Sequence, residues 1–90
     1  MKPTICQLRK SCSSFAASML QKLKANQHKN GWQDMPVWEL YKRLEDEKLE
    51  LLLAIVANDA DAIKKEAADV GNFAMMISEN AGTNETSKTS

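Results

Sequence analysis

Apolar residues recur at every third or fourth position along three long stretches of this 90-residue chain, a spacing typical of amphipathic helices. The predicted helices cover residues 4–27, 36–57 and 59–80. Only three glycines and two prolines punctuate the chain. These features predict an all-α fold with three main helices. The clearest apolar stripe lies in the first helix and consists of Ile5, Leu8, Cys12, Phe15, Met19, Leu20 and Leu23.

The second and third helices carry apolar residues on more than one face. The residues expected to supply apolar contacts in the second helix are Trp38, Tyr41, Leu44, Leu51, Leu52, Ile55 and Val56, and those expected on the inward side of the third are Ile63, Ala67, Val70, Phe73, Ala74 and Ile77. Three helices cannot bury all of this surface, so we expect a homo-oligomer, a dimer or a tetramer. In it, an antiparallel hairpin of the second and third helices would complete a four-helix-bundle-type core. Residues 1–82 would form this domain, and residues 83–90, which include no apolar side chain, a disordered tail.

Charge and cysteine usage exclude several classes of protein. Twelve basic and twelve acidic residues cancel, which disfavours a nucleic-acid-binding module. Cys6 and Cys12 lie six residues apart and would point in different directions on one helix, as free thiols. No stretch reaches the roughly 18 apolar residues of a membrane span, and none resembles a signal peptide. We therefore expect a cytoplasmic protein with no membrane partner.

Four acidic residues are arranged symmetrically about the expected turn at Asn58. Glu50 and Glu66 lie eight residues from it on either side, and Glu47 and Asp69 lie eleven residues from it. In an antiparallel hairpin the members of each pair stand at equal heights, about 12 Å and 16 Å from the turn. The three-residue spacing within each helix also keeps its two acids on one face. The sequence therefore predicts that four carboxylates converge.

Converging carboxylates raise one another's pKa unless a cation neutralises them. A cluster of oxygen ligands without histidine or cysteine favours Mg²⁺, or Mn²⁺, over zinc. Acids three residues apart are also common on solvated helix faces. Two features favour the metal interpretation: Glu50 lies inside the apolar run 49–56, and Asp69 directly precedes another that begins at Val70.

The acidic pattern resembles a known family. Asp46-Glu47-x-x-Glu50, followed by fifteen residues and then Glu66-x-x-Asp69, resembles the signature of the MazG-like nucleotide pyrophosphohydrolases. Segments 22–32 and 65–73 resemble short, often phage-associated members, and the resemblance spans about residues 15 to 80. It implies paired all-α subunits and magnesium-dependent cleavage of a nucleoside triphosphate to the monophosphate and pyrophosphate. The four acids would then be metal ligands. The family often has glutamate where this chain has Asp46, so the role of Asp46 stays open.

The expected mechanism is attack by a metal-activated water between the α- and β-phosphates, with Glu50 as the candidate general base. Lys24 and His28 share a helix face and could contact phosphate or base. Trp32 could stack on a nucleobase or fill the seam between the first two helices. Asn72 could contact the sugar or the base. Each of these four residues also has a purely structural interpretation, as a solvated or packing side chain.

Two other functions fit the same pattern. One is a non-catalytic helical interaction or regulatory protein whose acids are merely solvated. The other is a degenerate family member that binds nucleotide without hydrolysing it. Neither the preferred nucleobase nor the preferred sugar follows from the sequence.

Overall fold

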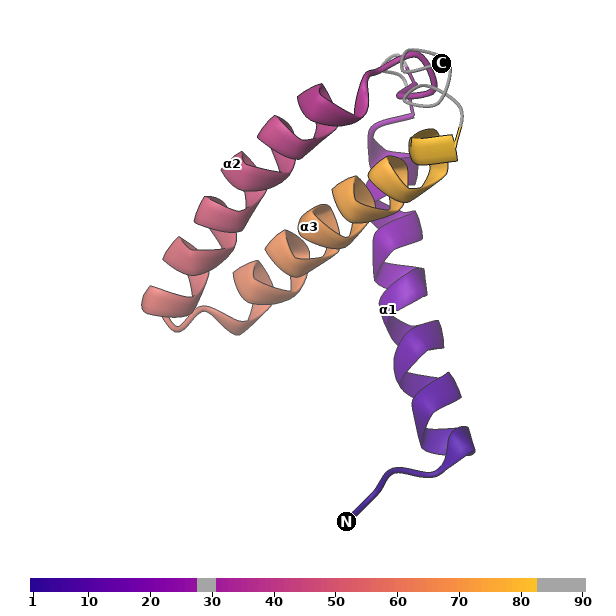
Figure 1. The fold of residues 1–90 in the computed structure, drawn as a ribbon. Coiled ribbons are helices and arrows are strands. Elements are labelled where there is room, and N and C mark those ends of the chain that lie inside the picture. Colours follow the sequence, from indigo (N-terminus) through magenta and orange to yellow (C-terminus); the bar gives the residue numbers. More distant parts are fainter. Residues whose placement is uncertain (28–30, 83–90) are drawn as a thin grey trace.

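The computed structural model describes residues 1–27 and 31–82, which form three helices and, within those ranges, no strand. These are α1 (Ile5–Ala25), α2 (Val37–Val56) and α3 (Ala60–Asn80) (Figure 1). The all-helical prediction is confirmed, and each helix end lies within two residues of its predicted place. The predicted disorder of residues 83–90 and the predicted role of His28 concern positions outside the described residues.

Local sequence explains where α1 and α3 begin. At the start of α1, the hydroxyl of Thr4 accepts a hydrogen bond from the backbone N–H of Gln7, and the Gln7 side chain accepts one from the N–H of Thr4. This reciprocal pair is a capping box. At the start of α3, the carboxylate of Asp59 accepts from the N–H of Ala62. Between α2 and α3, Asn58 has a φ of 55°, a left-handed conformation that asparagine tolerates in a tight reversal.

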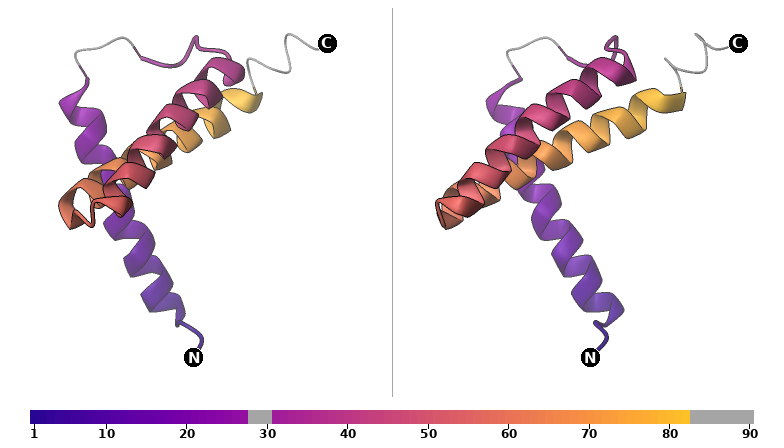
Figure 2. Two further views of the ribbon diagram at one scale, coloured as in Figure 1. Left: turned by 90° about the vertical axis from the view of Figure 1, so that its left-hand side faces the viewer. Right: turned by 60° about the vertical axis from the view of Figure 1, so that its left-hand side comes forward.

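The two later helices form an antiparallel hairpin, and α1 packs across one side of it. Among the described residues, α1 contacts α3 but not α2. The amino-terminal half of α1 projects away from the hairpin (Figures 1 and 2). The crossing is close at Gly71, where a β-carbon would lie 2.7 Å from Cε2 of Phe15. Only glycine permits this approach without displacing the ring.

One chain buries few of the apolar side chains that were predicted to face inward. Its buried apolar residues are Leu40, Ala54, Ala68 and Met76. Within one chain the ends of α2 stay exposed, since Trp38 is 70% exposed and Val56 is 75% exposed. In α1 no residue is buried. Other residues of the apolar sets named from the sequence that are exposed within one chain are Ile5, Leu8, Cys12, Phe15, Leu20, Tyr41, Leu52, Ile55 and Ala74.

In α3 the buried positions differ from the predicted ones by about one residue. Ala68, Asn72 and Met76 are buried, whereas the predicted Ala67 and Phe73 are half-buried. The reason is that α3 is apolar over a wide arc, and its neighbours within the chain cover only part of it.

Within the described ranges, no helix combines the length and the apolar character needed to cross a bilayer.

Candidate metal centre

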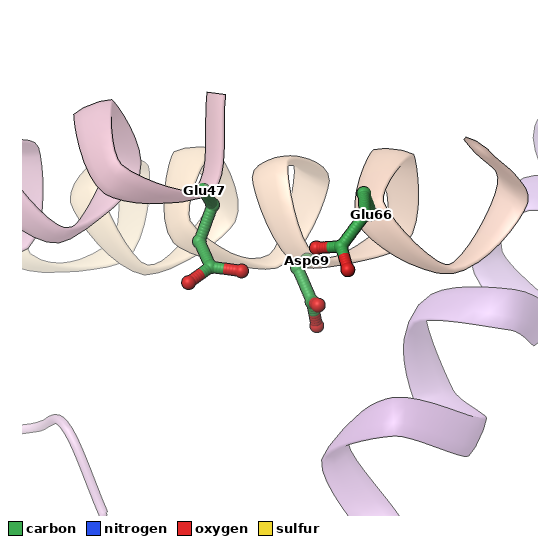
Figure 3. Close-up of side chains that lie close together, drawn as sticks. All are labelled: Glu47, Glu66 and Asp69. Atoms are coloured by element: carbon green, nitrogen blue, oxygen red, sulfur yellow. The ribbon is translucent and has the colours of Figure 1, made fainter. Parts of the chain in front are cut away.

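Three carboxylates from two helices converge on one side of the hairpin. Glu47 comes from α2, and Glu66 and Asp69 come from α3; one oxygen from each lies within 4.8 Å of the others (Figure 3). The three-residue step places Glu66 and Asp69 on one face of α3, and the antiparallel pairing brings Glu47 across to them. All three side chains are half-buried. The arrangement offers a cation several oxygen ligands and no nitrogen or sulfur.

The folded protein disfavours negative charge at this cluster. Burial raises the pKa of Glu47, and so do the charges of Asp69 and Glu66, a hydrogen bond with Asp69 and the charge of Glu50. Burial likewise raises the pKa of Glu66, together with the charges of Asp69 and Glu50, while the ammonium of Lys22 acts in the opposite direction. A bound cation would relieve both the burial cost and the mutual repulsion.

Glu50 is the predicted ligand that the structure does not bring into this group. Its side chain is exposed, and the three-carboxylate group among the described residues omits it. Its neighbours Leu49 and Leu53 are exposed as well, so the apolar run around Glu50 does not enclose it within one chain. Glu50 lies one helical turn nearer the α2–α3 turn than Glu47, and its exposed side chain stays outside the group. Its charge still acts on Glu47 and Glu66.

An open cleft of about 800 Å³ adjoins the carboxylates. Its volume falls in the range typical of small-molecule sites, about 300–1,000 Å³. Residues from α1, from the segment before α2, and from α2 and α3 line it. Of the residues singled out from the sequence, those that line it are Lys24, Trp32, Glu47, Asp69 and Asn72.

Trp32 forms part of the cleft wall and is tied to the end of α3. Its indole N–H donates to Oε1 of Glu79 at 3.2 Å. Its backbone carbonyl accepts from the side-chain amide of Asn80 at 2.9 Å, and the same amide donates to the carbonyl of Met35 at 2.9 Å. Asn80 is buried, so its two hydrogen bonds are partly shielded from water. Two side chains of α3, those of Glu79 and Asn80, thus hold Trp32, and among the described residues α1 and α2 do not contact each other to form a seam for it to fill.

Asn72 is buried beside the cleft, with only 4% of its surface exposed. Its amide nitrogen donates to the backbone carbonyl of Met19 in α1 at 3.1 Å. Its Oδ1 is also buried, and no hydrogen-bond partner for it exists among the described residues. A buried acceptor of this kind is costly unless a donor reaches it. Asn72 therefore combines a structural bond to α1 with an unused acceptor next to the carboxylates.

Two cationic residues of the cleft were not singled out from the sequence. Lys22 forms an ion pair with Asp69, with 3.3 Å between Nζ and Oδ2. Arg43 lines the cleft and forms only a long, exposed pair with Glu39. The signal for Lys22 was its place two residues before Lys24, inside the segment that carries the family resemblance. Periodicity does not reveal which residue of α1 faces α3.

Comparisons with models of protein families, with curated proteins and with solved structures found no match to this chain. Its function must therefore be inferred from its own residues and their geometry.

Proposed function

We propose that this chain is a magnesium-dependent nucleoside triphosphate pyrophosphohydrolase of the MazG-like type, which yields a nucleoside monophosphate and pyrophosphate. One observation carries the proposal: carboxylates of Glu47, Glu66 and Asp69 converge beside a cleft of about 800 Å³ that also presents lysine side chains. The cleft is large enough for a nucleotide. Its charges are complementary to a polyphosphate bound together with a divalent cation.

The donor set fits Mg²⁺, with Mn²⁺ as the substitute. Mg²⁺ takes carboxylate oxygens and retains waters and substrate phosphates as its remaining ligands. When bound, the ion would neutralise phosphate oxygens and lower the pKa of a coordinated water. Glu47, Glu66 and Asp69 would hold it. Glu50, which is exposed and close enough to influence two of these acids, remains the candidate proton acceptor.

Other cleft residues fit the remaining parts of a nucleotide. Lys24 supplies an exposed ammonium for the phosphates. Trp32, half-buried and held at its indole nitrogen, offers an aromatic ring for stacking on a base. Asn72 offers its unused Oδ1 to a hydroxyl or amino group. Lys24 attracts any polyphosphate, whereas Trp32 and Asn72 would discriminate between nucleosides.

A homo-oligomer is part of the proposal, as a dimer or a tetramer. The radius of gyration is 15.1 Å, compared with about 12 Å for a compact chain of this length. Leu49, Leu52, Leu53 and Val56 leave a row of exposed apolar side chains along α2. Packing of a second hairpin on this row would complete a four-helix core.

We place the protein in the cytoplasm, where nucleotides and Mg²⁺ are available, and propose a phage or prophage origin from the resemblance.

The test is a pyrophosphate-release assay on the eight common ribo- and deoxyribonucleoside triphosphates with Mg²⁺. At least one should be hydrolysed. Glu47→Gln and Asp69→Asn should each lose about 100-fold or more, because even outer-sphere partners of metal ligands cost about 10- to 100-fold. Glu45→Gln removes an exposed carboxylate two residues from Glu47 and serves as the matched control, with activity retained. Glu50→Gln tests the proton acceptor, since unchanged release would remove it from that role.

The products and a binding assay separate the competing functions. Release of phosphate and nucleoside diphosphate would contradict cleavage between the α- and β-phosphates. A degenerate nucleotide binder would gain thermal stability with Mg²⁺ and nucleotide but release nothing, whereas an interaction module would gain none.

A further inference from the structure

Lys22 is the cation that α1 brings to the carboxylate cluster. Its Nζ lies 3.3 Å from Oδ2 of Asp69, with 33% of the lysine side chain and 20% of the aspartate side chain exposed. In the described ranges, this is the one ion pair that joins two different helices. The same ammonium opposes the rise in the pKa of Glu66. One positive charge therefore partly neutralises an acidic cluster that forms no other ion pair with the residues that the structure describes.

The backbone that carries Lys22 is held against α3 at two points. Asn72 donates to the carbonyl of Met19, three residues before Lys22 and on the same face of α1. One turn earlier, Phe15 meets Gly71 with no space for a β-carbon. The side chain of Lys22 is nevertheless long, flexible and partly exposed. Its base is thus fixed beside the cluster while its ammonium can change partners.

A divalent ion bound by Asp69 and the ammonium of Lys22 compete for the same oxygen and repel each other. The adjoining cleft provides another place for the ammonium, since Lys22 lines it together with Lys24. The buried Oδ1 of Asn72, which has no donor among the described residues, is an independent second group in that cleft that a ligand with a donor would satisfy. A ligand with phosphate groups would offer the displaced ammonium new oxygen partners.

We propose that Lys22 is an exchangeable counter-cation: it neutralises Asp69 in the metal-free protein and transfers to the nucleotide phosphates once a metal ion takes its place. The transfer rests on the proposed function, because it needs a phosphate ligand. It makes metal and nucleotide binding mutually favourable. A metal ion alone must compete with the ammonium of Lys22 for Asp69. When nucleotide is present, its phosphates bind the displaced ammonium, so metal binding becomes more favourable.

The experiment titrates the whole chain with Mn²⁺ alone and measures free Mn²⁺ by electron paramagnetic resonance. Lys22→Met should bind Mn²⁺ about fivefold more tightly than the wild type, the equivalent of about 1 kcal/mol, which suits a partly exposed ion pair. Lys22→Arg keeps the charge and should bind like the wild type. Lys10→Met, on the same helix about 18 Å further along its axis, makes the same change of charge and should leave Mn²⁺ affinity within about twofold.

Nucleotide affinity provides the second half of the test. Lys22→Met should raise KM for the nucleotide about tenfold, although it tightens Mn²⁺ binding, and Lys22→Arg should have the KM of the wild type. A purely structural role of Lys22 would not tighten metal binding. In the wild type, Mn²⁺ should increase acetylation of Lys22, read by mass spectrometry, since the amine leaves its carboxylate. This measurement requires no variant to fold.

The outcomes distinguish this inference from the proposed function. Equal or weaker Mn²⁺ binding by Lys22→Met, or unchanged acetylation of Lys22, would overturn the exchange while wild-type hydrolysis still upheld the enzyme. An unchanged KM would overturn the transfer to phosphate. If the wild type neither bound Mn²⁺ nor released pyrophosphate, both proposals would be overturned together.

Discussion

The side-chain amide of Asn72 donates a hydrogen bond to the backbone carbonyl of Met19, and this contact joins α3 to α1 one turn beyond Asp69. Because Asn72 is buried, the bond is protected from competition with water. It sets the height at which α1 crosses the hairpin and so the place of Lys22 over the carboxylates. A polar residue within the packed face of α3 thereby links the fold to the candidate site.

Asn72→Ala should lower the free energy of unfolding by about 1–3 kcal/mol, because it removes the part-buried hydrogen bond that joins α3 to α1. Urea denaturation of the metal-free protein measures the change. Asn26→Ala, which removes an exposed side-chain hydrogen bond to Lys22 O within α1, is the control and should cost less. If the two variants lost the same free energy of unfolding, the bond to Met19 would contribute no more than an exposed hydrogen bond.

Gly71→Ala should destabilise the wild type, by about 1–3 kcal/mol, since the new methyl group would overlap the ring of Phe15. In a Phe15→Ala background the same substitution should stabilise by up to about 1 kcal/mol, from the higher helix propensity of alanine. Thermal unfolding of the four proteins of this cycle checks the change of sign. Additive effects would mean that the close approach does not limit position 71.

The metal-free protein should become less stable as pH rises above 4.5, the ordinary pKa of a glutamate. Glu47 and Glu66 have raised pKa values when folded, so the folded state holds more protons than the unfolded state between 4.5 and those raised values. The contribution of these two groups to the free energy of unfolding is therefore complete below 4.5 and lost as pH rises through the folded pKa. Urea denaturation in a chelator across this range measures it.

Glu47→Gln should weaken this pH dependence and make the metal-free protein more stable at pH 7, while Glu45→Gln should leave it unchanged. Adding Mg²⁺ should stabilise the wild type at pH 7, and this gain should disappear as acid protonates the carboxylates. The assigned pKa shifts would be contradicted if the wild type and both variants, all free of metal, became more stable as pH rose through this range.

Asn80→Ala should loosen the segment that carries Trp32, because one buried amide bonds the carbonyls of Trp32 and Met35. We expect a loss of about 1–3 kcal/mol in stability. We also expect a rise in KM for the nucleotide with a smaller change in kcat, since Asn80 lies eleven residues beyond Asp69 in α3, about 16 Å further along the helix axis. Steady-state kinetics on the best substrate separates the two constants. A fall in kcat alone would place the effect at the metal centre instead.

Leu52→Glu should dissociate the oligomer, because it puts a charge into the exposed apolar row of α2 that we assign to contact between copies. Sedimentation equilibrium should show the mass of a single chain, about 10 kDa. Lys2→Glu places a negative charge at an exposed position ahead of α1, outside that row, and should leave the assembly intact. A wild type that sediments as one chain would refute the assembly directly.

Features that depend on one or two helical turns could be predicted without the fold. The three helices and the shared face of Glu66 and Asp69 follow from spacing along the chain. The approach of Glu47 to Asp69 also followed, since counting from a single turn sets heights in an antiparallel hairpin. The sequence did not predict which apolar residues of α1 and α2 become buried within one chain, because a helix that is apolar on several faces does not reveal which face a neighbour will cover.

The amino-acid sequence by itself determined the helices, their order and the pairing of acids across the hairpin, because hydrogen bonds and side-chain spacing within a helix act over a few residues. Tertiary structure alone decided that Glu50 is exposed, that Asn72 bonds to Met19 and that Lys22 reaches Asp69. These depend on the roll of α2 and the crossing of α1, which packing between distant residues sets, as where Phe15 meets Gly71.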